Sequence, residues 1–158
     1  MAVAYLSIGT NIGNKRKNLI IASALLAERV GDVLALSAFY KTEPWGFDSE
    51  NEFLNAALVL ETQKSPEELL ALSSLIEQEM GRTVKSDGRY HDRIIDIDIL
   101  LYDDLVMETS SLTLPHPRMH RRLFVLEPMI EIASNVIHPV LKKSMLELYQ
   151  ICVSDKES

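Results

Sequence analysis

The chain has 158 residues, of which 47% are hydrophobic and 25% charged, and its formal net charge is −7 at pH 7. A chain of this length suits one domain with a substantial core, so we expect residues 1–158 to form a single catalytic domain. The acidic balance argues against a nucleic-acid surface. No uninterrupted apolar run is long enough to span a bilayer, which argues against a membrane protein.

Cys152 is the only cysteine, which excludes an intrachain disulfide and is typical of a reducing compartment. We expect it to be a small buried hydrophobe on the last helix. Residues 1–9 have no basic stretch before their apolar residues, so they predict a strand and not a signal peptide. The expected location is therefore the cytoplasm.

The first part of the chain predicts a strand at 2–8, a glycine-bearing turn at 9–14 and a helix at 15–30, with Asn14 as its cap. The turn lacks the GK[ST] ending of a phosphate-binding loop, so we interpret it as a plain connection. A second strand is expected at 33–40, before a loop punctuated by proline and glycine.

Residues 53–62 predict a third strand whose two faces differ. Leu54, Ala56 and Leu58 make one apolar face, whereas Phe53 and Asn55 lie together on the other. An aromatic ring beside an amide can hold a flat heterocycle, since the ring stacks and the amide reads the heterocycle's edge. A core phenylalanine beside a solvated asparagine would give the same pattern.

Ser65, Pro66 and Glu68 form a complete helix start signal, and Gly81 is expected to end that helix. With a further strand at 93–101, the order is β-α-β-β-α-β. The expected fold class is therefore α+β, with a ferredoxin-like core. Its antiparallel sheet would carry helices on one face, and a C-terminal helical extension would follow.

The strand at 93–101 carries two carboxylates on one face. Asp96 and Asp98 alternate with isoleucines, so their Cα atoms are expected to lie about 7 Å apart on the same side. Oxygen ligands of this kind, completed by substrate phosphates, are typical of Mg²⁺ sites. Two acids on a solvent-facing strand would look the same. The opposite, apolar face is expected to hold Ile95, Ile97, Ile99 and Leu101.

The segment before this strand, residues 82–93, has no clear period and contains four fixed cations. Such a loop beside paired carboxylates could take the outer oxygens of a metal–polyphosphate complex, although a solvated surface loop is the alternative. The cations are Arg82, Lys85, Arg89 and Arg93.

The last third predicts short strands at 105–107 and 112–114, and a helix at 141–153 with Leu141, Met145 and Leu148 facing inward. Between them His116 lies between two prolines, which would hold it in a rigid loop where it could donate to phosphate. The four histidines show no zinc-binding spacing.

Six blocks of sequence carry a family resemblance: AYLSIGTNIGN, FYKTEPWG, FLNAAL, the GR that opens the basic loop, DRIIDIDILLY and LPHPRMHRRLFVLEP. With these blocks the chain resembles the 6-hydroxymethyl-7,8-dihydropterin pyrophosphokinase family of folate biosynthesis over essentially its whole length. The resemblance implies transfer of the β,γ-pyrophosphoryl group of ATP to the pterin hydroxymethyl oxygen, with release of AMP. It also implies two Mg²⁺ ions, with ATP as co-substrate.

The resemblance assigns roles to individual residues. It implies that Asp96 and Asp98 hold both metal ions and act in catalysis with Arg82 and Arg93. The implied pterin site consists of Thr42, Trp45, Phe53, Asn55 and Phe124, with the two phenylalanines on either side of the ring. The implied ATP site consists of Glu77, Arg82, Arg93, Ile99, Thr113, His116 and Arg122.

The basic loop departs from the family pattern, because Tyr90-His91-Asp92-Arg93 stands where many members have Trp-Gly-Pro-Arg. The roles of Lys85 and Arg89 therefore stay open, as do those of Tyr90 and His91.

Two other functions fit the topology. A ferredoxin-like small-molecule sensor would bind its ligand without chemistry, and an RNA-binding fold would stack bases on sheet aromatics. The acidic charge and the two aspartates oppose the second. The expected partners are ATP and the pterin, with no nucleic acid and no membrane, and the expected state is a monomer.

Overall fold

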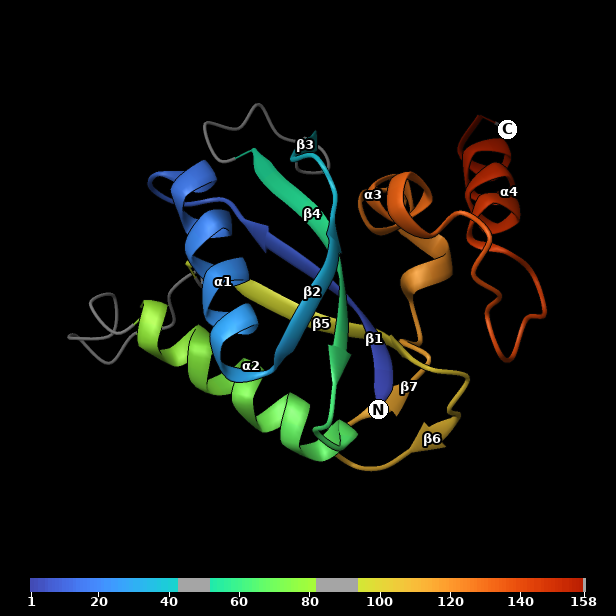
Figure 1. The fold of residues 1–158 in the computed structure, drawn as a ribbon. Coiled ribbons are helices and arrows are strands. Elements are labelled where there is room, and N and C mark those ends of the chain that lie inside the picture. Colours follow the sequence, from blue (N-terminus) through green and yellow to red (C-terminus); the bar gives the residue numbers. More distant parts are fainter. Residues whose placement is uncertain (43–51, 82–93, 158) are drawn as a thin grey trace.

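The computed structural model describes residues 1–42, 52–81 and 94–157, which form a mixed fold of helices and antiparallel sheet (Figure 1). The main elements in chain order are β1 (Ala2–Thr10), α1 (Lys15–Arg29), β2 (Gly31–Leu36), β3 (Tyr40–Thr42), β4 (Phe53–Thr62), α2 (Pro66–Gly81), β5 (Asp96–Tyr102), β6 (Met107–Glu108), β7 (Thr113–Leu114), α3 (Leu123–Ala133) and α4 (Met145–Glu157).

The main sheet has the order β2-β4-β1-β5, with β3 also paired to β4, and its pairs are antiparallel. The expected strand at 33–40 is wrong as one element, because it is divided into β2 and β3. Between them Ser37 leaves the regular ladder, and its hydroxyl accepts a hydrogen bond from the Ala57 N–H at 2.8 Å. A side chain thus takes one position of the backbone ladder, and the regular strand is interrupted there.

Helices α1 and α2 cover one face of the sheet (Figure 1). The helix predicted at 15–30 is confirmed as α1, and its Leu19, Ala22 and Leu26 are fully buried at three- and four-residue spacing. The predicted caps are confirmed as well. The Asn14 side chain accepts from the Lys17 N–H at 3.1 Å, and Ser65 and Glu68 exchange hydrogen bonds of 3.0 and 3.2 Å at the start of α2.

Helices α3 and α4 pack on the opposite face, which corrects the expectation that helices cover only one face of the sheet (Figure 1). Val125, Leu126 and Met129 of α3 are buried there against Ala57 of β4. Apolar residues at three- and four-residue spacing drive this packing. Only part of the face therefore stays open, and α3 forms a wall beside it.

Strand β5 contains a local irregularity that corrects one predicted face. Tyr5 pairs with Leu101 and Leu6 with Ile99, so Leu100 is an additional residue opposite β1. An extra residue reverses the alternation beyond it. Leu100 and Leu101 both pack toward α3 and α4, whereas Ile99 packs toward α1 and α2.

The C-terminal helix begins later than expected, at Met145. Leu141 precedes it and is 37% exposed, so its predicted inward position is wrong. Met145, Leu148 and Cys152 are buried, as predicted. Among the described residues no helix is both long and apolar enough to cross a membrane.

Candidate active site

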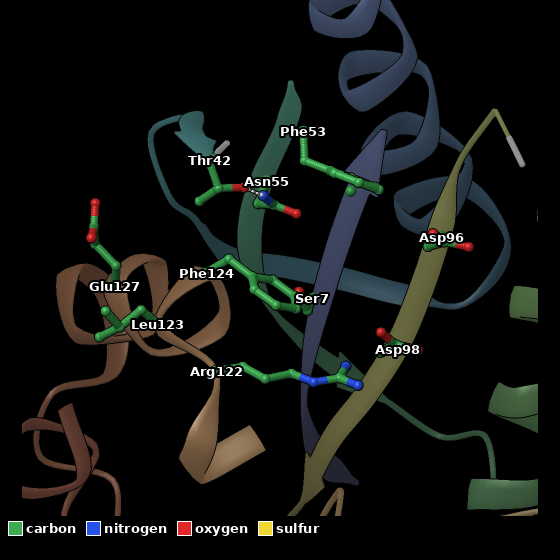
Figure 2. A pocket seen from close by; sticks show the side chains of 11 residues that line it. Ser7, Thr42, Phe53, Asn55, Asp96, Asp98, Arg122, Leu123, Phe124 and Glu127 are labelled. Atoms are coloured by element: carbon green, nitrogen blue, oxygen red, sulfur yellow. Dashed lines mark hydrogen bonds between the residues drawn. The ribbon is translucent and has the colours of Figure 1, made fainter. Parts of the chain in front are cut away.

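A cavity of about 550 Å³ lies over the open part of the sheet, beside the first turns of α3 (Figure 2). It brings together side chains from β1, β3, β4, β5 and α3, which are far apart in the sequence. Its lining consists of Ser7, Gly9, Thr42, Phe53, Asn55, Asp96, Asp98, Arg122, Leu123, Phe124 and Glu127.

The floor of the cavity is the central strand β1, which carries small residues there. Gly9 pairs with Asn55 on one side and with Asp96 on the other. Ser7 pairs with Asp98 in the same way. Directly paired residues share a face of the sheet. The floor therefore separates the amide from the two carboxylates and leaves the space above β1 open.

The Asn55 side chain is fixed within the sheet. It is 3% exposed, and its Nδ2 donates a hydrogen bond of 2.7 Å to the Thr42 hydroxyl. Its Oδ1 lies so close to Gly9 that a β-carbon there would be 2.5 Å away. Such a contact is well inside van der Waals distance. The hydrogen bond to Thr42 therefore holds the amide in one orientation, and Gly9 leaves the space that this orientation needs.

Two phenylalanines line the cavity from opposite elements, Phe53 from the start of β4 and Phe124 from the start of α3 (Figure 2). The Arg122 guanidinium carbon lies 5.5 Å from the centre of the Phe124 ring, which is a cation–π distance. Figure 2 shows the Arg122 side chain extending toward Asp98. A flat apolar surface and a fixed positive charge therefore adjoin each other.

Asp96 and Asp98 are partly buried on the cavity face of β5, as their alternation predicted. In the described part of the chain no group of three or more histidine, cysteine or acidic side chains could hold a metal ion. Two carboxylates alone still suit Mg²⁺, which commonly binds one or two protein carboxylates and completes its shell with water and substrate phosphates. The donor set therefore fits magnesium that arrives with a polyphosphate.

His116 and Thr113 line a separate cavity of about 380 Å³. Burial lowers the pKa of His116 below its ordinary value; the Asp98 carboxylate opposes this shift and Arg122 adds to it. The His116 Nδ1 accepts a hydrogen bond from the Arg118 N–H at 3.1 Å, so the proton of the neutral ring lies on Nε2. His116 is thus a neutral donor within electrostatic reach of Asp98.

Two other residues expected at the ATP site lie outside both cavities. Glu77 accepts a hydrogen bond of 2.8 Å from the Ile97 N–H, at the edge of β5 that does not face β1. Ile99 is 4% exposed and belongs to the core under α1 and α2. Both are therefore on the side of β5 that faces α2.

Trp45, Arg82 and Arg93 lie outside the described residues, as do Lys85, Arg89, Tyr90 and His91. Four further residues line the first cavity and were not predicted from the sequence: Ser7, Gly9, Leu123 and Glu127. The sequence did contain a signal for Ser7 and Gly9, because these small residues alternate with the apolar Leu6 and Ile8.

The fold and cavity define a small α+β protein with a candidate ligand site, in which two phenylalanines, a fixed amide and paired carboxylates line one cavity. A family model described as 7,8-dihydro-6-hydroxymethylpterin-pyrophosphokinase (HPPK) matches residues 5–134. The chain belongs to this family of transferases.

Two curated relatives are similar over nearly their full length. A 2-amino-4-hydroxy-6-hydroxymethyldihydropteridine pyrophosphokinase of Porphyromonas gingivalis is 47% identical over 141 residues, which cover 88% of this chain and 95% of the relative. The Aquifex aeolicus protein of the same name is 39% identical over 147 residues, covering 93% of this chain and 90% of the relative.

Solved structures share the fold at lower identity. A crystal structure of HPPK-DHPS in complex with substrates aligns with a TM-score of 0.75 and 16% identity, covering 99% of this chain and 44% of that chain. Plasmodium falciparum HPPK-DHPS with pteroate gives a TM-score of 0.76 and 18% identity, covering 97% of this chain and 42% of that chain.

Proposed function

We propose that this protein transfers the β,γ-pyrophosphoryl group of ATP to the hydroxymethyl oxygen of 6-hydroxymethyl-7,8-dihydropterin, giving AMP and the pterin diphosphate in folate biosynthesis. The family match and the named relatives support this function. The observation that carries it is a single cavity that offers an aromatic slot with an amide at one side and two carboxylates at the other.

The pterin occupies the slot between Phe53 and Phe124, because a flat ring stacks well on both. The Asn55 amide reads the polar edge of the ring, and Thr42 keeps that amide oriented. Trp45 belongs to the same site through the family pattern alone. Glu127, at the α3 side of the cavity, adds a carboxylate that can accept from ring N–H groups.

ATP binds on the β5 side of the pterin. Asp96 and Asp98 would hold two Mg²⁺ ions, which would neutralise the polyphosphate and polarise the phosphorus under attack. By the family pattern, the triphosphate oxygens are met by Arg82, Arg93, His116 and Arg122. The same pattern places Glu77, Ile99 and Thr113 at the nucleotide, and Ile99 would contribute its backbone because its side chain is buried in the core. Arg122 and the His116 Nε2–H supply fixed donors next to the carboxylates.

The protein contributes mainly positioning and electrostatics, as is usual for phosphoryl-type transfer. The slot holds the hydroxymethyl group in line with the phosphorus, and Arg122 takes charge that develops on the oxygens. Phe53, Leu123 and Phe124 keep water from the reacting groups by filling the sides of the cavity.

The observed order β2-β4-β1-β5 supports a ferredoxin-like arrangement of these four strands. Strand β3, which pairs with β4, is an addition to that core. We infer that the whole chain is one catalytic domain and acts as a monomer, since α3 of the same chain supplies the wall opposite Phe53.

Wild-type protein with ATP, Mg²⁺ and 6-hydroxymethyl-7,8-dihydropterin is expected to produce AMP. An ordinary kinase directs the acceptor to the γ-phosphorus and makes ADP, whereas here it attacks the β-phosphorus. Chromatography of the nucleotide products distinguishes the two, and a chelator should stop the reaction. ADP as the main product would reject pyrophosphoryl transfer. Pterin binding without nucleotide consumption would favour a sensor.

The Gly9→Ala substitution should weaken pterin binding about tenfold while changing stability little. The new β-carbon would displace the Asn55 carboxamide, which lies 2.5 Å from that position, and the end of a side chain can move without unfolding the sheet. Titration calorimetry with the pterin and thermal unfolding measure the two effects. Unchanged pterin affinity would show that the amide orientation is unimportant for recognition.

A further inference from the structure

One carboxylate on α3 reaches the place where the sheet edge breaks between β2 and β3. Both oxygens of Glu131 accept from the Ala38 N–H, at 3.0 and 3.1 Å, and Oε1 also accepts from the Tyr40 hydroxyl at 2.6 Å. Ala38 lies between the two strands, where no strand partner supplies an acceptor for its N–H. Glu131 therefore replaces a missing ladder partner.

Glu131 joins α3, which carries Phe124, to β3, which pairs with the part of β4 that carries the other side of the candidate pterin slot. On β3, Tyr40 pairs with Asn55 and Thr42 pairs with Phe53, so all four side chains share the cavity face of the sheet. On α3, Phe124 lies two helical turns before Glu131, which places both on one side of the helix. The distance between these elements sets the width of the slot.

We propose that Glu131, with Tyr40 and the Ala38 N–H, is a positioning clamp that fixes α3 against β3 and thereby sets pterin affinity. The inference rests on the proposed function for the identity of the ligand. Neither Glu131 nor Tyr40 lines the cavity, so the clamp acts through Phe124 and Thr42 and touches no substrate.

The clamp is suited to hold its geometry at neutral pH. The hydrogen bond to Glu131 raises the pKa of Tyr40 to about 12, so the hydroxyl keeps its proton. Hydrogen bonds to an ionised acceptor are stronger and shorter than neutral ones. Packing of Val125 and Met129 against the sheet holds α3 independently, so loss of the clamp should loosen the slot without unfolding the protein.

Calorimetric titration of the pterin compares Glu131→Ala, Glu131→Gln and Tyr40→Phe with wild type. We expect the Kd to rise about tenfold for Glu131→Ala and about threefold for the other two, which each keep part of the clamp. The KM for the pterin should rise similarly, while the KM for ATP stays within twofold. Glu28→Gln, at an exposed position of α1 across the sheet, is the matched control and should behave as wild type.

A lower melting temperature with unchanged pterin Kd in all three variants would show that the contact only stabilises the fold. Equal losses for pterin and ATP would likewise overturn the clamp, because a shift of α3 against β3 should act on the pterin slot first. If wild-type protein makes no AMP, the proposed function fails, while the pterin Kd of the variants still decides the role of Glu131.

Discussion

Asp96→Asn and Asp98→Asn should each reduce kcat/KM by at least about 10²–10³-fold, the effect expected when a group that stabilises transition-state charge is lost. The amide keeps the shape of the side chain but removes the negative charge that would bind Mg²⁺. Both residues are only partly buried and face the cavity, so the fold should persist. Turnover at saturating Mg²⁺ and far-UV circular dichroism should be measured on the same samples.

Asp104→Asn is the matched control, since Asp104 lies in the exposed turn after β5 and outside the cavity. Its turnover should equal that of wild type. Wild-type turnover in either Asp96→Asn or Asp98→Asn would refute the proposal that the substituted aspartate binds Mg²⁺. Loss of the far-UV signal would instead show that the aspartate is needed for folding.

The sequence predicted the two faces of β4 and most of those of β5, because strict alternation leaves little freedom once one face is apolar. Leu58 and Leu60 had to face the helices, so Phe53 and Asn55 had to share the opposite side. In the structure the two strands lie on either side of β1. Periodicity therefore predicted which residues face the site, and the strand order brings them together.

The packing of α3 and α4 on the sheet face opposite α1 and α2 could not be predicted in the same way. Pro128 lies inside α3, and a proline within a helical pattern ordinarily argues against a helix. Burial of Val125, Leu126 and Met129 outweighs that cost. The sequence identified Phe124 only through family resemblance, because its place beside the sheet depends on this tertiary packing.

The irregularity at Leu100 could not be predicted from the sequence either. Residues 99–101 are consecutive apolar residues, so either face is chemically acceptable for each, and the local pairing with β1 decides. The clamp by Glu131 depends on the break between β2 and β3, and a continuous predicted strand at 33–40 gave no reason to look for an acceptor there.

Phe124→Ala should weaken pterin binding by ~1–3 kcal/mol, or roughly 5- to 150-fold, by analogy with bases stacked on aromatic side chains. ATP affinity should fall much less. The substitution removes the ring under Arg122, whose guanidinium carbon lies 5.5 Å from the ring centre. Arg122 and Phe124 are half-buried. A cation–π contact that solvent still reaches contributes about 0.5–1 kcal/mol, so its loss corresponds to about fivefold or less.

Phe124→Tyr tests whether the ring itself is responsible, because it keeps the stacking surface and should retain pterin affinity close to wild type. Separate calorimetric titrations with the pterin and with a non-hydrolysable ATP analogue measure the two affinities. If Phe124→Ala lowered nucleotide affinity more than pterin affinity, the aromatic slot would belong to the nucleotide. The positions of the two substrates relative to β5 would then be exchanged, and the acceptor would approach the carboxylates from the side of β5 that faces α2.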